Sequence, residues 1–306
     1  MSATPEYSID TKDIFRIELC HFSSELPYFK KRSEAYLHSL LSNKPKMILM
    51  QSVIPSSYNM QSNLKNLGFL ESGDLKSTVF DKDKSTVNMT WVSNEVTVIE
   101  SKKIPITIMK NDKTIVLAPD CLKTRIAYRG RTLTVYNFEN ISGSFHSEAR
   151  IQAAGIVNKD AYLSKSRNSN TANDVFIIGG NMHCESDSQT IALIEGNYTR
   201  QGYAPAEWQD IWDELNPNAI ISCERSATQR LEATAMFSKD IVLPQFMKPR
   251  RTMFFFTPKD VFGKIGTPIK IVRNGLDSTS EGIPYSGNYG LSLDLYMPVN
   301  NPFINS

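Results

Sequence analysis

Four residues that could bind a metal ion lie a few positions after a short apolar run in the second half of this chain. His183, Cys184, Glu185 and Asp187 lie close together in the sequence. An imidazole beside a thiol suits a soft ion such as Zn²⁺. Structural zinc sites add a second pair of ligands at a characteristic spacing, and the sequence offers none. We therefore expect this segment to be a surface loop without a metal ion.

Two further groups could serve acid–base or metal chemistry. Asp210, Asp213 and Glu214 have the spacing of neighbouring positions on a helix. Acidic residues in this pattern are typical of a solvated helix face, where we expect them to lie. His146 with Glu148 is another pair that could carry a relocated site.

The overall composition describes an ordinary globular protein without a strong electrostatic bias. The 306 residues include 41% hydrophobic and 22% charged side chains, and the formal net charge is +2. A net charge so close to zero argues against a broadly basic nucleic-acid surface, although a local basic patch is compatible with it. Four widely spaced cysteines without a C-x-x-C pair indicate reduced thiols.

The sequence carries no recognisable targeting or membrane segment. No apolar stretch approaches the roughly 20 residues that span a bilayer. The first ten residues are polar and lack the apolar centre of a signal peptide. We therefore expect an intracellular protein that does not enter a membrane, and both the nucleus and the cytoplasm are compatible with the sequence.

Apolar periodicity predicts many strands with a few helices between them. Strands are expected near 14–20, 47–50, 69–79, 86–92, 95–99, 123–128, 132–137, 175–178, 252–256, 269–272 and 291–296. Helices are expected over 28–41, 147–163 and 208–215. This pattern predicts an α/β (α+β) sandwich with mixed sheets. We expect one domain over 13–298, a flexible leader over 1–12 and a tail over 299–306.

Seven segments, in one order along the chain, resemble motifs of a single superfamily. They are 47–55, 133–140, 148–152, 175–182, 209–215, 251–255 and 286–291. Together they resemble the endonuclease/exonuclease/phosphatase superfamily, with the type-2 tyrosyl-DNA phosphodiesterases as the most similar branch. The resemblance implies a DNase I-like fold, in which two mixed, mostly antiparallel sheets flanked by helices form a four-layer sandwich.

The resemblance also implies magnesium-dependent chemistry, which this sequence does not match. Family members hold Mg²⁺ with acidic oxygen ligands and use His, Asp and Asn groups on protons and phosphate. Ser52 stands at the family's metal-binding Glu, and Gly180 and Met182 stand at the Asp and Asn of its Gly-Asp-x-Asn loop. The other matching catalytic positions carry His21, Ser23, Asn137, Arg251, Gly287 and Asn288.

A site with these substitutions is expected to bind no Mg²⁺ and to lack the family's activity. At an effective dielectric near 20, one charge about 4 Å from a cation is worth about 4 kcal/mol, and several acids are missing here. The loss of several catalytic groups removes orders of magnitude in rate. Glu139 matches a position that the family keeps. Because the other matching site positions carry no acidic residue, we expect Glu139 to have a structural hydrogen-bonding role. We therefore expect no cofactor and no metal site.

The expected function is that of a pseudoenzyme that binds or scaffolds protein partners, since long loops on a rigid frame carry recognition. The alternative is a metal-free binder of nucleic acid or phosphate. Its candidate contacts are the basic residues Arg125, Arg129, Arg131, Lys248, Arg250 and Arg251. A divergent but active magnesium-dependent phosphodiesterase is a second alternative.

Overall fold

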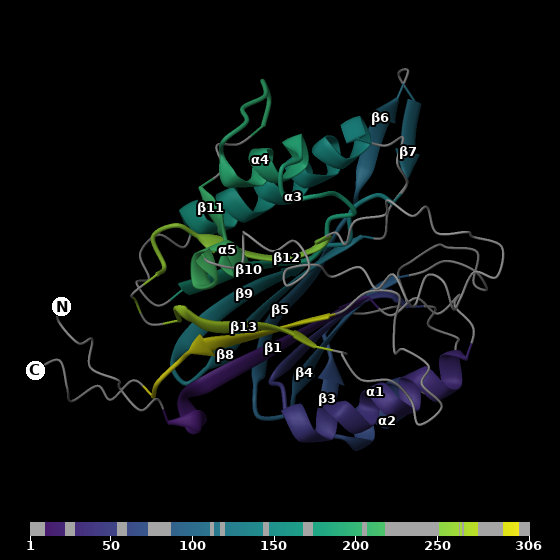
Figure 1. The fold of residues 1–306 in the computed structure, drawn as a ribbon, viewed down its shortest axis with the longest axis vertical. Helices are drawn as coiled ribbons and strands as arrows, with labels where there is room; N and C mark the ends of the chain where they lie inside the picture. The colour runs from purple at the N-terminus through teal and green to yellow at the C-terminus, as the bar shows by residue number, and fades with distance from the viewer. Residues whose placement is uncertain are drawn as a thin grey trace, which may run out of the picture.

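Two six-stranded sheets, stacked face to face and covered by helices, make the centre of the structure (Figure 1). This computed structural model describes residues 10–21, 28–53, 60–72, 87–110, 113–116, 120–142, 147–167, 174–203, 207–217, 251–262, 264, 266–274 and 290–299. Within these ranges, no helix is long and apolar enough to cross a membrane.

The first sheet has the strand order β13-β14-β1-β2-β4-β3. Its strands are β1 (Ile14–His21), β2 (Met47–Val53), β3 (Phe69–Glu71), β4 (Val87–Ser93), β13 (Pro268–Asn274) and β14 (Gly290–Tyr296). β1 and β2 are parallel, whereas the other neighbours are antiparallel. The first and last described parts of the chain therefore meet in one sheet.

The second sheet has the order β11-β12-β10-β9-β8-β5. Its strands are β5 (Thr97–Ile104), β8 (Cys121–Tyr128), β9 (Arg131–Asn137), β10 (Asp174–Asn181), β11 (Trp208–Asp210) and β12 (Met253–Pro258). β9 and β10 are its parallel pair. A small antiparallel hairpin, β6 (Thr107–Lys110) with β7 (Lys113–Val116), stands apart from both sheets.

Helices cover the outer faces and complete four layers. The first sheet is covered by α1 (Phe29–Asn43) and α2 (Met60–Asn66), and the second by α3 (Ser147–Arg167) and α4 (Gln189–Glu195). A short turn η1 (Thr11–Asp13) precedes β1, and α5 (Ile211–Leu215) contacts β12 and β13. The predicted α/β sandwich with mixed sheets is therefore confirmed.

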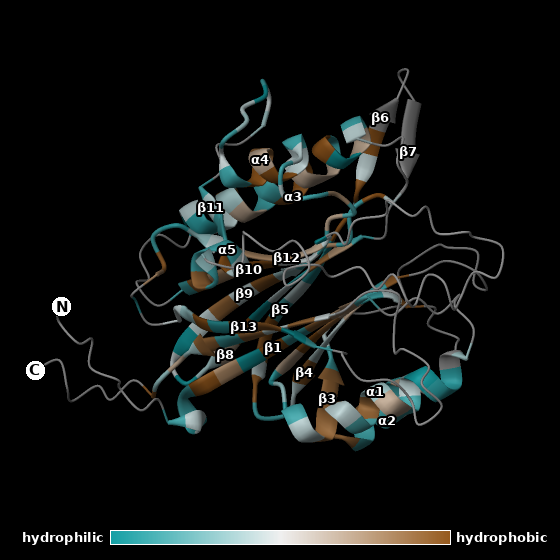
Figure 2. Cartoon of the chain, viewed as in Figure 1, coloured by the Kyte–Doolittle hydropathy of each residue, from teal (hydrophilic) through white to brown (hydrophobic). Residues whose placement is uncertain are grey.

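Strand alternation sends side chains from β10 into two different cores. Val175 and Ile177 pack between the two sheets, whereas Phe176 and Ile178 pack beneath α3 and α4. A strand that is covered on both faces has to be apolar on both, which explains the continuous apolar run. Figure 2 shows apolar residues along the strands, while the helices mix polar and apolar positions.

The helix expected over 208–215 is shorter in the structure. Residues 208–210 form β11, and α5 begins only at Ile211. Asp210 sets this start, because its side chain accepts a hydrogen bond from the backbone N–H of Trp212 at 2.9 Å. An acidic side chain in this position caps a helix and ends the extended segment before it.

A buried acid lies on β1, three residues before that strand ends. Glu18 is only 1% exposed, and it accepts hydrogen bonds from Ser292 Oγ at 2.6 Å and from Asn274 Nδ2. Burial raises its pKa from the ordinary 4.5 to about 7, against the opposing effect of these two bonds and of Arg16. Asp294, which pairs with Arg16, adds a further small rise.

This buried acid predicts that stability falls as pH rises between about 4.5 and 7. In that window the folded protein holds a proton on Glu18 that the unfolded chain has released, so deprotonation favours unfolding. At about 1.4 kcal/mol per pKa unit, the change from 4.5 to about 7 corresponds to about 3 kcal/mol. Glu18→Gln should remove this part of the pH dependence of the free energy of unfolding, measured by urea denaturation at pH 4 and pH 8.

Glu34→Gln, on the exposed side of α1, is the matched control. Parallel pH profiles for wild type and Glu18→Gln would contradict this assignment.

Candidate functional site

Four central strands bring their carboxyl ends together on one side of the sandwich. β1 and β2 are parallel neighbours in the first sheet, as β9 and β10 are in the second. His21 ends β1 and Ser52 is the next-to-last residue of β2, while Glu139 and His183 follow the ends of β9 and β10. Parallel neighbours end on the same side of a sheet, where sheet-based folds place their ligand sites. The topology therefore gathers these four residues.

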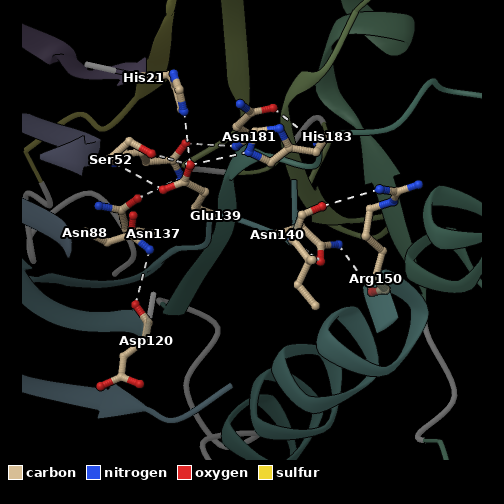
Figure 3. Close-up of polar contacts among 12 residues, drawn as sticks. His21, Ser52, Asn88, Asp120, Asn137, Glu139, Asn140, Arg150, Asn181 and His183 are labelled. Atoms are coloured by element: carbon tan, nitrogen blue, oxygen red, sulfur yellow. Dashed lines mark hydrogen bonds and ion pairs between the residues drawn. The ribbon is translucent and has the colours of Figure 1, made fainter. Parts of the chain in front are cut away.

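Glu139 is the centre of this group (Figure 3). Its Oε1 lies 3.0 Å from His21 Nε2 and 3.3 Å from His183 Nε2, and it accepts a hydrogen bond from Ser52 Oγ at 2.6 Å. Its Oε2 accepts a hydrogen bond from the Ser52 backbone N–H at 3.1 Å. The two imidazole rings meet edge to face, with centroids 5.7 Å apart. Both sheets thus contribute partners to one carboxylate.

Glu139 keeps its negative charge although its side chain is 5% exposed. Burial raises the pKa of this carboxyl, but hydrogen bonds from His183, His21 and Ser52 outweigh burial and hold the pKa well below its usual range. An ionised group in the interior is costly unless it is paired and hydrogen-bonded. The two histidines and Ser52 therefore have to stay in place for the folded state to keep this charge.

Two of the residues that contact Glu139 have a left-handed backbone. The φ angles are 53° at Ser52 and 49° at His183. Such angles are uncommon for residues other than glycine and concentrate at functional sites. At His183 the backbone N–H donates to Asn181 Oδ1 at 3.1 Å, and the Asn181 N–H donates to Gln51 Oε1 at 2.9 Å. The second histidine is therefore positioned from both sheets.

A buried pair of amide side chains beneath Glu139 joins the two sheets. Gln51 Nε2 donates to Asn137 Oδ1 at 3.1 Å, and both residues are fully buried. Asn137 Nδ2 donates to the carbonyl oxygens of Met50 at 3.2 Å and Met89 at 2.9 Å. Position 137, which the sequence resemblance assigns to a histidine, here carries an amide that links β9 to β2 and β4.

The end of β10 has no room for the acid that the resemblance places there. A Cβ atom at Gly180 would lie 1.6 Å from the carbonyl oxygen of Phe138. The chains approach so closely because pairing continues beyond β9, with Phe138 N–H donating to the Gly179 carbonyl at 2.9 Å. Met182 is fully buried in the core beneath α3 and α4. Neither Gly180 nor Met182 brings a side-chain oxygen to the site.

Arg251 is a buried ion-pair partner. Its Nη2 lies 2.7 Å from Asp210 Oδ2 and 3.0 Å from Asp213 Oδ1, and its guanidinium lies 4.5 Å from the centre of the Phe254 ring. The expectation that Asp210 lies on a solvated face is wrong, because this residue is 2% exposed. Burial raises the pKa of Asp210 to about 6, against the effect of Arg251.

The three arginines expected to form a basic patch contact or approach other parts of the protein. Arg125 lies 3.8 Å from Asp174, and Arg129 lies 2.8 Å from Asp13. Arg131 is 3% exposed. Arg125 and Arg129 thus each lie within 4 Å of an acidic side chain, and Arg131 is buried.

Several residues named from the sequence lie outside the described residues. They are Ser23, His146, Lys248, Arg250, Gly287 and Asn288. The leader over 1–12 is described only from residue 10, and the tail over 299–306 only at residue 299.

Comparison with known proteins gives a consistent result for the fold. No protein-family model and no curated protein sequence matches this chain. Among solved structures, a humanised TDP2 from D. rerio is 16% identical with a TM-score of 0.66, covering 92% of this chain and 99% of that one. TDP2 from C. elegans is 12% identical with a TM-score of 0.67, covering 95% of this chain and 78% of that one.

Two further solved structures with lower TM-scores have the same kind of fold. The human nocturnin catalytic domain is 11% identical with a TM-score of 0.61, covering 94% of this chain and 95% of that one. A Bacteroides vulgatus protein described as an endonuclease/exonuclease/phosphatase has a TM-score of 0.58 at 11% identity, covering 93% of this chain and 99% of that one. This chain has the endonuclease/exonuclease/phosphatase fold. The resemblance seen in the sequence is confirmed at this level, including the four-layer DNase I-like sandwich.

The cluster of His21, Glu139 and His183 was not predicted from the sequence. The possible ligand atoms of the three residues all lie within 4.8 Å of one another. Segment 183–187 is a loop, as expected, but His183 turns inward through its left-handed backbone. The signal available in the sequence was the position of the three residues at or just after the ends of three strands.

The close approach at Gly180 predicts that no side chain can be restored there. Gly180→Ala should lower the free energy of unfolding by about 3 kcal/mol, the upper end for overpacking, because the obstacle is main-chain oxygen. Gly180→Asp should lower the free energy of unfolding at least as much and should not create a Mg²⁺ site. Urea denaturation measures the free energy of unfolding of both variants.

Gly202→Ala is the matched control, since a Cβ there meets open space and only the φ of +89° resists it. It should cost about 1 kcal/mol. An Asp at position 180 that leaves stability unchanged would contradict the packing described for β10.

Proposed function

We propose that this chain does not hydrolyse phosphodiesters with Mg²⁺ and that it serves as a protein-binding module built on the endonuclease/exonuclease/phosphatase fold. The observation that carries the proposal is the set of donors at the ends of β1, β2, β9 and β10. Among the described residues at these strand ends, Glu139 is the one carboxylate in the group, and it already has four contacts there from His21, Ser52 and His183.

This donor set does not suit Mg²⁺. A magnesium ion demands near-ideal octahedral geometry, with oxygen ligands at about 2.0–2.1 Å. Ser52 turns its hydroxyl and its N–H toward Glu139, and Gly180 leaves no room for a carboxylate. The nearest other groups are imidazole nitrogens, which suit different ions. The described residues at these strand ends therefore do not fit the metal that the family uses.

An edge of the second sheet offers a surface for a protein partner. β5 stands last in the strand order, and its Val98 and Ile99 are 37% and 49% exposed. An edge strand carries backbone groups that another chain can pair with, and neighbouring apolar side chains add specificity. We propose that a protein partner binds along β5.

The first test is for activity. Wild-type protein and TDP2 are assayed in parallel for release of 5′-phosphotyrosyl ends and for cleavage of single-stranded DNA, with and without Mg²⁺. We expect activity at least about 10⁴-fold below that of TDP2, as for other losses of several catalytic groups. Millimolar Mg²⁺ should not change the melting temperature beyond an equal ionic strength of NaCl. Metal-dependent turnover near that of TDP2 would overturn the proposal.

The second test is for the partner. Full-length protein with Val98→Asp and Ile99→Asp should lose a stoichiometric partner that wild-type protein retains during purification from its own cells. Val272→Asp is the matched control, since Val272 is 40% exposed on β13, which is an edge strand of the first sheet. Equal recovery of the partner with all three proteins would exclude β5 as the binding surface.

Binding of single-stranded nucleic acid is a second candidate, because a similar structure is D. rerio TDP2 complexed with a single-strand DNA product. That structure is 16% identical to this chain with a TM-score of 0.65. A gel-shift titration with a single-stranded oligonucleotide at low salt separates the two candidates. Saturable binding that weakens steeply with salt would favour the nucleic-acid function.

A further inference from the structure

We propose that His21, Glu139 and His183 form a binding site for a divalent transition-metal ion of the Zn²⁺ type. The site would be made of two imidazole nitrogens and one carboxylate oxygen, a donor set different from the oxygen ligands of a magnesium site. The inference does not rest on the proposed protein-binding function, because the ion would stand at the strand ends and not along β5.

The distances in the cluster are close to those of a coordination shell. Zinc lies about 2.0–2.2 Å from histidine nitrogen and carboxylate oxygen, so two ligands of a tetrahedral ion are separated by about 3.3–3.6 Å. Glu139 Oε1 lies 3.0 Å from His21 Nε2 and 3.3 Å from His183 Nε2. All three ligand atoms lie within 4.8 Å of one another. An ion can therefore be placed between them with small rotations of the side chains.

The donor types select the class of ion. Imidazole suits Zn²⁺, Cu²⁺, Ni²⁺ and Fe²⁺, whereas Mg²⁺ and Ca²⁺ prefer oxygen. Two neutral imidazoles and one carboxylate bring one negative charge to a divalent ion. Three protein ligands also leave a fourth position for water or an anion, as in zinc sites that do chemistry.

Neighbouring groups already orient two of the three ligands, Glu139 and His183. Ser52 donates to both oxygens of Glu139 through its hydroxyl and its backbone N–H, which fixes the carboxylate plane. His183 is held by the bond from its N–H to Asn181, itself bonded to Gln51. Partners of this kind raise affinity because they fix the ligand before the ion arrives.

The carboxylate of the cluster is buried, whereas the two histidines are partly exposed to solvent. The side chain of Glu139 is 5% exposed, whereas those of His21 and His183 are 13% and 20% exposed. An ion can reach the site past the histidines, and inside it meets a sheltered carboxylate. Figure 3 shows His21 and His183 approaching Glu139 from different segments of the chain.

The competing explanation is a metal-free cluster in which the imidazoles only hydrogen-bond to a buried carboxylate. The two explanations differ in their response to added ions. A metal site takes up one ion per chain with an affinity that depends on both histidines, whereas a purely structural cluster does not bind ions selectively.

The test is a calorimetric titration of full-length protein, first stripped with a chelator, with ZnCl₂ and separately with MgCl₂. We expect one Zn²⁺ per chain and no measurable Mg²⁺ binding. His21→Gln and His183→Gln should each weaken Zn²⁺ binding by about 100-fold or more, since removal of even an outer partner costs about 10- to 100-fold. Saturating Zn²⁺ should raise the melting temperature of the wild-type protein and not that of these variants.

Two matched controls remove the obvious alternatives. His38→Gln alters an exposed histidine on α1, and Cys184→Ser removes the thiol next to His183, and neither should change the affinity. Retained binding in both His21→Gln and His183→Gln, or loss of binding in Cys184→Ser, would overturn the proposal.

A spectrum of the wild-type protein serves if a histidine variant fails to fold. Co²⁺ in place of Zn²⁺ should give visible d–d bands of a nitrogen and oxygen site without a thiolate charge-transfer band. A strong thiolate band, or no Zn²⁺ uptake at a tenfold excess, would also overturn the proposal.

Discussion

The arrangement of the strand ends depends on one buried negative charge. Glu139 sits where the two sheets meet, and a carboxylate in that position keeps its charge only if donors reach both of its oxygens. Ser52 supplies two of them and the histidines supply the rest. The donor residues lie at the ends of three different strands, β1, β2 and β10, and Glu139 follows β9, so the strand order and the local chemistry support each other.

The same junction also joins the two sheets around the cluster. The amides of Gln51 and Asn137 bond to each other across the gap between the sheets, and Asn137 also bonds to main-chain oxygens of β2 and β4. Gly180 lets β9 and β10 approach without a side chain between them. Arg251 is paired with Asp210 and Asp213. Positions that could hold a cluster of acids are thus used for packing and for joining the sheets.

Much of the fold could be predicted from the sequence because its signals are local or ordered along the chain. The apolar run Val175–Ile178 and the helical spacing after residue 147 reflect strand and helix geometry directly, and the motifs occur in one consistent order. The start of α5 was missed because capping by Asp210 competes with helical spacing. The Glu139 cluster was missed for a different reason. His21 and His183 are 162 positions apart, and only the strand order of two sheets brings them to one carboxylate.

If these strand ends form a nitrogen-rich site around Glu139 and no magnesium site, the ion that binds there can be identified by diffraction. Crystals grown with both ZnCl₂ and MgCl₂ would be measured above and below the zinc absorption edge. We expect one anomalous peak within about 2.2 Å of His21 Nε2, His183 Nε2 and Glu139 Oε1. An octahedral ion without anomalous signal beside Ser52, or zinc bound elsewhere while Glu139 keeps only hydrogen bonds, would contradict it.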